Sequence, residues 1–191
     1  MTKSSIKNAI GTVCMCLPFL IMISGFLYPG ENIKNWWHSL SASYYNQNSF
    51  MFIICFSALI VLLFADKDIC SNIMGVFMAI ILLFPCADGT LVITQDEVGV
   101  FGLSPSLSDK IHSLACLLSG VAVVIKDAML IKQTKRNLFI VLLILMLTSI
   151  GIITYENILH ANGDWSFHWS TIFTETIIFV CCGVMYKSIE Y

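Results

Sequence analysis

Long runs of hydrophobic residues, separated by shorter polar stretches, divide the chain into six segments. The runs are Ala9–Tyr28, Phe50–Ala65, Ile73–Cys86, Ile111–Ile125, Leu138–Tyr155 and Trp169–Tyr186. A helix needs about 20 apolar residues to cross a hydrocarbon core of about 30 Å. Three runs approach this length, and the flanks Ser39–Ser49 and Asp88–Leu91 can lengthen the second and third. Because backbone groups in hydrocarbon must be paired within the segment, each run is predicted to be a helix.

These segments predict an all-α fold, a polytopic transmembrane helical bundle that forms a single domain over residues 1–191. About six spans are expected; four or five stay open if the third or fourth run is re-entrant. The chain is 58% hydrophobic and 12% charged, against about 45–50% and about 25% in soluble domains. This composition argues against a soluble enzyme or a disordered tail. The net charge of −2 gives no basic field for direct binding of nucleic acid.

Basic residues are distributed unequally between the two sides of the predicted bundle. If the N-terminus is cytoplasmic, six spans place both termini inside. The basic residues that then face the cytoplasm are Lys3, Lys7, Lys67, Lys126, Lys132, Lys135, Arg136 and Lys187. Lys34 and Lys110 face outside. Lysine and arginine are enriched in cytoplasmic loops, so the eight-to-two distribution favours this orientation.

The outer side collects aromatic, acidic and imidazole side chains, including all four histidines and all four tryptophans. Interfacial belts of tryptophan and tyrosine explain part of this pattern. They do not explain why the inner side has almost no such belt, and the remainder indicates a polar pocket between the outer ends of the helices. The candidate ligand-sensing residues are Ser41, Tyr44, Tyr45, Asp88, His112, Glu156, His160, His168 and Glu175.

Two of these candidates carry specific expectations. Glu175 is the clear acid inside a span, about 9 Å along the helix from Trp169. An acid at membrane depth is a functional candidate by default, and its expected partner is His112 or Tyr45. Asp88 is predicted to cap the outer end of the third span. The alternative for Glu175 is an acid that reaches the interface or that has a structural partner.

The segment from Lys126 to Asn137 is predicted to be an inner loop, basic with an apolar centre. Such a loop sets topology and attracts anionic lipid. Its alternative role is docking of a cytoplasmic effector protein. The candidate docking residues are Lys126, Lys132, Lys135 and Arg136.

Small residues in the spans allow close approach of helices, so a homo-oligomer is expected as well. These residues are Gly75, Ser113, Ser119, Gly120 and Gly151. The eight cysteines mostly lie in apolar runs without paired CxxC motifs, so they are interpreted as small hydrophobic residues. No cofactor and no metal is expected.

An intramembrane zinc hydrolase is the enzymatic alternative. Aspartate, histidine and serine at the ends of spans are similar to the alkaline ceramidase and adiponectin-receptor superfamily. The His-x-x-x-His pair of that family is missing, since His160 and His168 are eight residues apart and separated by a turn signal, Asn162-Gly163-Asp164. A pore-forming or transport protein is the third alternative, which would require a polar stripe through several spans.

The basic leader Met1–Lys7, the compact apolar spans, and the outer stretches Ser41–Tyr45 and Trp165–Trp169 resemble small multispan subunits of bacterial anti-phage defence systems, such as the membrane subunit of the Kiwa system. The resemblance implies a sensor in the bacterial inner membrane that assembles with itself and engages a cytoplasmic effector. The expected function is a non-enzymatic membrane sensor or scaffold that couples an outer-face perturbation to that partner.

Overall fold

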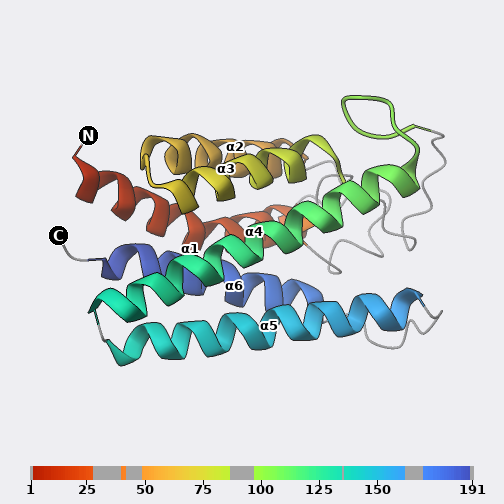
Figure 1. Ribbon diagram of the computed structural model, residues 1–191. Coiled ribbons are helices and arrows are strands. Elements are labelled where there is room, and N and C mark those ends of the chain that lie inside the picture. Colours follow the sequence, from red (N-terminus) through yellow and green to blue (C-terminus); the bar gives the residue numbers. More distant parts are fainter. Residues whose placement is uncertain are drawn as a thin grey trace.

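The structure is a computed structural model that describes residues 2–27, 40–41, 49–86, 97–134, 136–161 and 170–189. The described residues form six helices and no strand (Figure 1). The helices are α1 (Lys3–Leu27), α2 (Ser49–Ala65), α3 (Ile69–Leu83), α4 (Pro105–Thr134), α5 (Asn137–Ala161) and α6 (Ser170–Ser188). Each predicted apolar run lies on one of these helices, so the all-helical class is confirmed.

Four helices are long and apolar enough to cross a membrane, namely α1, α4, α5 and α6. The other two, α2 and α3, are apolar but have 17 and 15 residues. At about 1.5 Å per residue they are about 26 and 23 Å long, shorter than a hydrocarbon core of about 30 Å. The chain therefore has the helices of a multi-pass membrane protein, and the number of complete spans stays a prediction.

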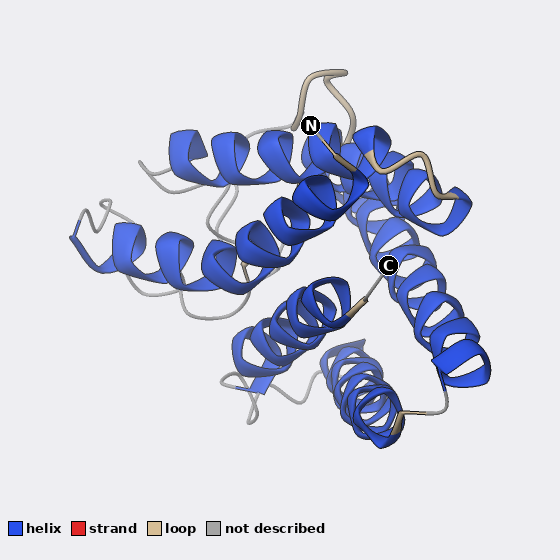
Figure 2. Ribbon diagram, turned by 90° about the vertical axis from the view of Figure 1, so that its left-hand side faces the viewer, coloured by secondary structure: helices blue, strands red, loops and turns tan. Residues whose placement is uncertain are grey.

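The six helices close into a ring, because consecutive helices pack together and α6 also packs against α1. Both termini lie at one end of the bundle, with the short α2–α3 and α4–α5 connections (Figure 1). We call this the terminal end and the opposite one the distal end. Figure 2, which views the molecule from the terminal end, shows that the helices are tilted relative to one another. The arrangement gathers toward one end those basic residues predicted to face inside that the structure describes.

Two of the helix ends that differ from expectation concern candidate residues. The fourth run was expected to end at Ile125, but α4 continues to Thr134, so most of the predicted inner loop is helical. No glycine or proline interrupts this stretch, and lysine, leucine, methionine and glutamine are good helix formers. Helix α3 ends at Leu83, ahead of Pro85. Asp88 lies outside the described residues, and the expected continuation of α3 into its segment is wrong.

The start of α3 is fixed by a side-chain cap. Asp68 has extended backbone geometry, and its carboxylate accepts the Ser71 backbone N–H at 3.2 Å. An N-cap aspartate of this kind satisfies one of the free amides in the first helical turn. The cap places Asp68 and Ser71 together at the terminal end.

Two glycines let the backbones of α1 and α6 touch. A Cβ atom built on Gly183 would lie 2.7 Å from the carbonyl oxygen of Gly11 and 3.1 Å from the Met15 nitrogen. A Cβ atom on Gly11 would lie 2.8 Å from the Gly183 carbonyl oxygen. Small residues permit such close helix packing in membranes. The contact that closes the ring therefore depends on the absence of two side chains.

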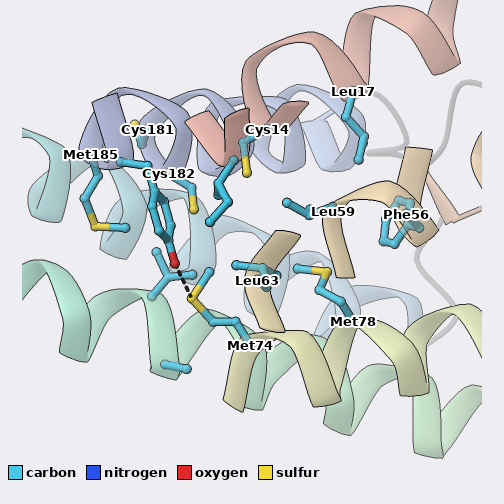
Figure 3. Packing of buried hydrophobic residues seen from close by; sticks show 14 of the residues in the cluster. Cys14, Leu17, Phe56, Leu59, Leu63, Met74, Met78, Cys181, Cys182 and Met185 are labelled. Carbon is cyan, nitrogen blue, oxygen red and sulfur yellow. Dashed lines mark hydrogen bonds between the residues drawn. The ribbon is translucent and has the colours of Figure 1, made fainter. Parts of the chain in front are cut away.

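The core between the helices is built from aliphatic, aromatic and sulfur-containing side chains. In Figure 3, Cys14 of α1 and Cys182 of α6 lie above Leu63, Met74 and Met78 of α2 and α3. All eight cysteines are free, and five of them are buried, in agreement with their interpretation as small hydrophobic residues. A dashed line in Figure 3 joins the sulfur of Met74 to the hydroxyl of Tyr186, which lies where the core meets buried polar groups.

Candidate functional site

A buried serine and a buried histidine meet at the distal end. Leu40 and Ser41 are 1% and 6% exposed, and the Ser41 Oγ lies 2.9 Å from the Nε2 atom of His112 on α4. The other ring nitrogen, Nδ1, lies 2.8 Å from the carbonyl oxygen of Phe84. A carbonyl oxygen only accepts, so Nδ1 carries the proton. In the neutral ring Nε2 is then an acceptor, and the Ser41 hydroxyl donates to it.

Glu175 of α6 holds the residue next to this serine. Its Oε2 atom accepts the Leu40 backbone N–H at 2.6 Å. The partner expected from the sequence was His112 or Tyr45. Instead Glu175 binds a backbone amide, and His112 binds the adjacent Ser41. The expected convergence of polar groups is thus present for Ser41, His112 and Glu175, which we call the distal cluster.

Glu156 joins the distal ends of α5 and α6. It is 2% exposed, and its Oε2 atom accepts a hydrogen bond from the Thr171 hydroxyl. Its Oε1 atom has no hydrogen-bond partner within the described part of the chain. The bond fixes two neighbouring helices, and among the described residues Glu156 makes no hydrogen bond to the distal cluster.

The remaining outer candidates are not placed. Tyr44, Tyr45, Asp88 and His168 lie outside the described residues. His160 belongs to α5, where its backbone is described. Their proposed roles stay predictions.

A second polar cluster, which the sequence did not predict, lies at the terminal end around Lys126 of α4. The Lys126 Nζ atom is 2.6 Å from Asp68 Oδ2, 2.8 Å from Ser71 Oγ and 3.6 Å from Asp66 Oδ2. It also lies 4.6 Å from the centre of the Tyr186 ring. Lys126 is 5% exposed. We call these five residues the terminal cluster.

Ser71 connects the members of this cluster. Its hydroxyl donates to Asp66 Oδ2 at 2.6 Å and accepts from Lys126, so Tyr186 on α6 acts as a donor to it at 2.6 Å. Burial acts to raise the pKa of Asp68, but the hydrogen bond and positive charge of Lys126, with the bond from the Ser71 backbone N–H, hold it below its ordinary value. The carboxylate is therefore charged near neutral pH, and the cluster ties α3, α4 and α6 together.

Asp127 lies beside the terminal cluster in sequence and is fully buried. Neither of its carboxylate oxygens has a hydrogen-bond partner among the described residues. Buried polar atoms are usually paired with protein or with ordered water. Lys126 and Asp127 were assigned to a loop because the apolar run stops at Ile125, and the structure corrects this assignment.

The correction changes the docking candidates. Lys126 is bound inside the bundle and presents no ammonium to a partner. Lys132 is exposed, and Arg136 is partly buried with its Nη1 atom donating to the Ser188 carbonyl at 3.2 Å. Lys135 lies outside the described residues.

The small residues divide in a similar way. Ser119 is buried. A Cβ atom built on Gly75 would lie 3.3 Å from the Phe64 ring, and one built on Gly120 would lie 3.3 Å from the Ile150 side chain. These three positions therefore serve packing inside the chain. Gly151 has no neighbouring atom within 4 Å of a built Cβ, and Ser113 is exposed. These two positions alone, within the group expected to mediate oligomer contacts, face outward.

One sequence signal could have found both clusters on α4. His112, Ser119 and Lys126 are spaced seven residues apart and lie on one buried face of the helix. A heptad spacing of polar residues within an apolar helix indicates a seam that faces other helices. The signal was missed because Lys126 had been placed beyond the end of the span.

The described segments contain no group of three histidine, cysteine or acidic side chains placed to hold a metal ion. Both ring nitrogens of His112 are already engaged in hydrogen bonds.

No protein-family model, no curated protein and no solved structure matches this chain.

Proposed function

We propose that this protein is a sensor or scaffold of the bacterial inner membrane, which couples a perturbation at its distal end to a cytoplasmic partner at its terminal end. The chain assembles with itself in this proposal. The effector docks at the terminal end, where Lys132 is exposed. Anti-phage defence is the setting that the sequence resemblance indicates.

The observation that carries the proposal is that the same two helices contribute to both polar clusters. Helix α4 carries His112 in the distal cluster and Lys126 in the terminal cluster. Helix α6 carries Glu175 and Tyr186 in the same way. The separations are about 21 Å along α4 and about 16 Å along α6.

This arrangement supplies a physical route for coupling. The Leu40–Ser41 segment is bonded to α6 through Glu175 and to α4 through His112. A ligand or membrane change that displaces the segment alters the restraint on both helices at once. Packed helices shift as units, so the change reaches the bonds of Lys126 and Tyr186. The stimulus acts by favouring one of two packings.

Hydrogen exchange of the purified chain in lipid nanodiscs tests this route. Ser41→Ala removes a bond that contributes about 1 kcal/mol, so amide exchange in residues 66–71 should accelerate about fivefold. Ser108→Ala is the matched control, because Ser108 is also a buried distal serine, but its hydroxyl donates to the Pro85 carbonyl and not to a group on α4 or α6. It should leave residues 66–71 unchanged.

Acceleration confined to the distal end in Ser41→Ala contradicts the coupling. The scaffold part of the proposal is tested separately. When the protein is cross-linked in its host and then purified, a soluble protein and further copies of the chain should be attached to it. A bare monomer by native mass spectrometry contradicts it.

A transport role is the second candidate, because α4 presents a buried polar seam. The seam contains Ser108, His112, Ser119, Lys126 and Asp127, and three oxygens on Ser119 and Asp127 have no described partner. Successive groups from His112 to Lys126 are about 10 Å apart along the helix, so water must bridge them. Liposomes that hold the protein should then dissipate a pH gradient, and Ser119→Ala should slow this. Tight liposomes exclude transport and leave the sensor proposal in place.

A further inference from the structure

The contact between Ser41 and His112 has the geometry of an activated nucleophile. The hydroxyl and the imidazole are within hydrogen-bond reach at 2.9 Å, and the Phe84 carbonyl fixes the far side of the ring at 2.8 Å. A nucleophile, a base and a group that orients the base are the three parts of serine-based covalent catalysis. Here the orienting group is a backbone carbonyl in place of a carboxylate.

Other buried serines show how this contact differs from a structural one. Ser108 donates to the Pro85 carbonyl, and an amide oxygen does not take up the proton. The Ser71 hydroxyl donates to Asp66, and its oxygen accepts hydrogen bonds from Lys126 and Tyr186. Ser41 donates to a nitrogen lone pair, so its proton can be removed by a group of suitable basicity.

The position of the serine is fixed from three directions. Glu175 holds the amide of the preceding residue, His112 holds the hydroxyl, and the end of α3 holds His112 through Phe84. Reacting groups held in place in this way need no further ordering before attack. Glu175 acts here as a positioning residue.

We infer that Ser41 is a nucleophilic serine that takes an acyl group from a carboxylic ester, with His112 as its general base. The Ser41 Oγ forms a bond to the ester carbonyl carbon, and the bond from that carbon to the alkoxy oxygen breaks. His112 takes the serine proton and returns it to the departing alcohol. No oxidant or cofactor takes part. This inference is independent of the sensor proposal.

The surroundings favour an ester with an apolar acyl chain. His112 is the eighth residue of α4, about 10 Å from its start, and the outward face of the same region exposes Leu107, Leu114 and Leu117. These leucines show that α4 has an apolar outer surface at the level of His112, on the side of the helix opposite to it. A substrate must therefore enter between the helices from apolar surroundings, and a membrane lipid ester is the substrate class.

A fluorophosphonate probe tests the nucleophile directly, because it forms a covalent bond with activated serines. The full chain in detergent should be labelled at Ser41, as located by peptide mass spectrometry. Ser41→Ala should abolish the label. His112→Gln keeps hydrogen-bonding groups but is no base, so it should slow labelling at least 100-fold. Ser108→Ala should label like wild type.

A pH profile separates chemistry from simple packing. The labelling rate should rise with pH as the histidine loses its proton, and this dependence should disappear in His112→Gln. The preference for acyl-chain length is measured by comparing the rates at which 4-nitrophenyl butyrate and 4-nitrophenyl palmitate acylate Ser41. The palmitate ester should react faster. Folded wild type that is not labelled at Ser41, or equal labelling in His112→Gln, overturns the inference. The exchange experiment on residues 66–71 is unaffected by either outcome.

Discussion

Lys126→Met lowers the free energy of unfolding by about 3 kcal/mol. Removing one partner of a buried ion pair costs about 3–5 kcal/mol because the other charge stays buried and uncompensated. The side chains of Lys126 and Asp66 are 7% and 1% exposed, whereas that of Asp68 is 40% exposed, which favours the lower end of this range. Ser71 and Tyr186 lose a bonding partner in the same variant.

Equilibrium unfolding of the chain in mixed micelles measures this loss. Lys132→Met is the matched control, since Lys132 lies on the same helix and is exposed, and it should stay within about 0.5 kcal/mol of wild type. In a double-mutant cycle, the double variant Asp68→Asn/Lys126→Met should lose less free energy of unfolding than the two single variants lose in sum. A Lys126→Met protein as stable as the Lys132→Met control shows that the terminal cluster contributes nothing to the fold.

Gly183→Ala separates α1 from α6 and costs about 1–3 kcal/mol, the usual penalty for overpacking. The new methyl group would lie 2.7 Å from a backbone oxygen and 3.1 Å from a backbone nitrogen of α1, neither of which can move without the helix. Gly11→Ala should have a similar effect, because its Cβ would meet the Gly183 carbonyl at 2.8 Å. The same unfolding assay measures both.

Gly151→Ala is the matched control for the glycine contact. A Cβ atom at this position meets nothing within 4 Å, and alanine gains about 1 kcal/mol of helix propensity over glycine. It should be neutral or stabilising. If all three alanine variants behave alike, the close approach of α1 and α6 is not a determinant of stability.

The positions of the helices could be predicted from the sequence because apolar runs and their polar interruptions are local signals. Four of the six runs end within three residues of the observed helix end. The end of α4 could not be located, because a lysine followed by an aspartate normally marks the exit from a membrane. Burial of Lys126 depends on Asp66 and Asp68, which are about 60 residues away and come near it only in the folded bundle.

The distal cluster could be predicted in part. Ser41, His112 and Glu175 were recognised as polar residues near the outer ends of spans. Their pairing was not, because Glu175 binds a backbone amide and His112 is oriented by a backbone carbonyl. Every residue carries these groups, so no side-chain pattern marks the ones that are used. The two glycines between α1 and α6 were missed for a related reason, since neither has a second small residue four positions away that would form a recognisable packing motif.

Closure of the ring has a consequence for biogenesis. Helix α1 is synthesised before the other described helices, but the contact at Gly11 cannot form until α6 has been made. Helix α6 follows the other five helices in chain order. During that interval Ser71 lacks the phenol of Tyr186, and the α1 backbone at Gly11 is uncovered. The nascent bundle is therefore an open arc with a partly unpaired polar edge. Such an intermediate exposes surface that the finished bundle covers, which makes misassembly before α6 arrives the characteristic risk of this topology.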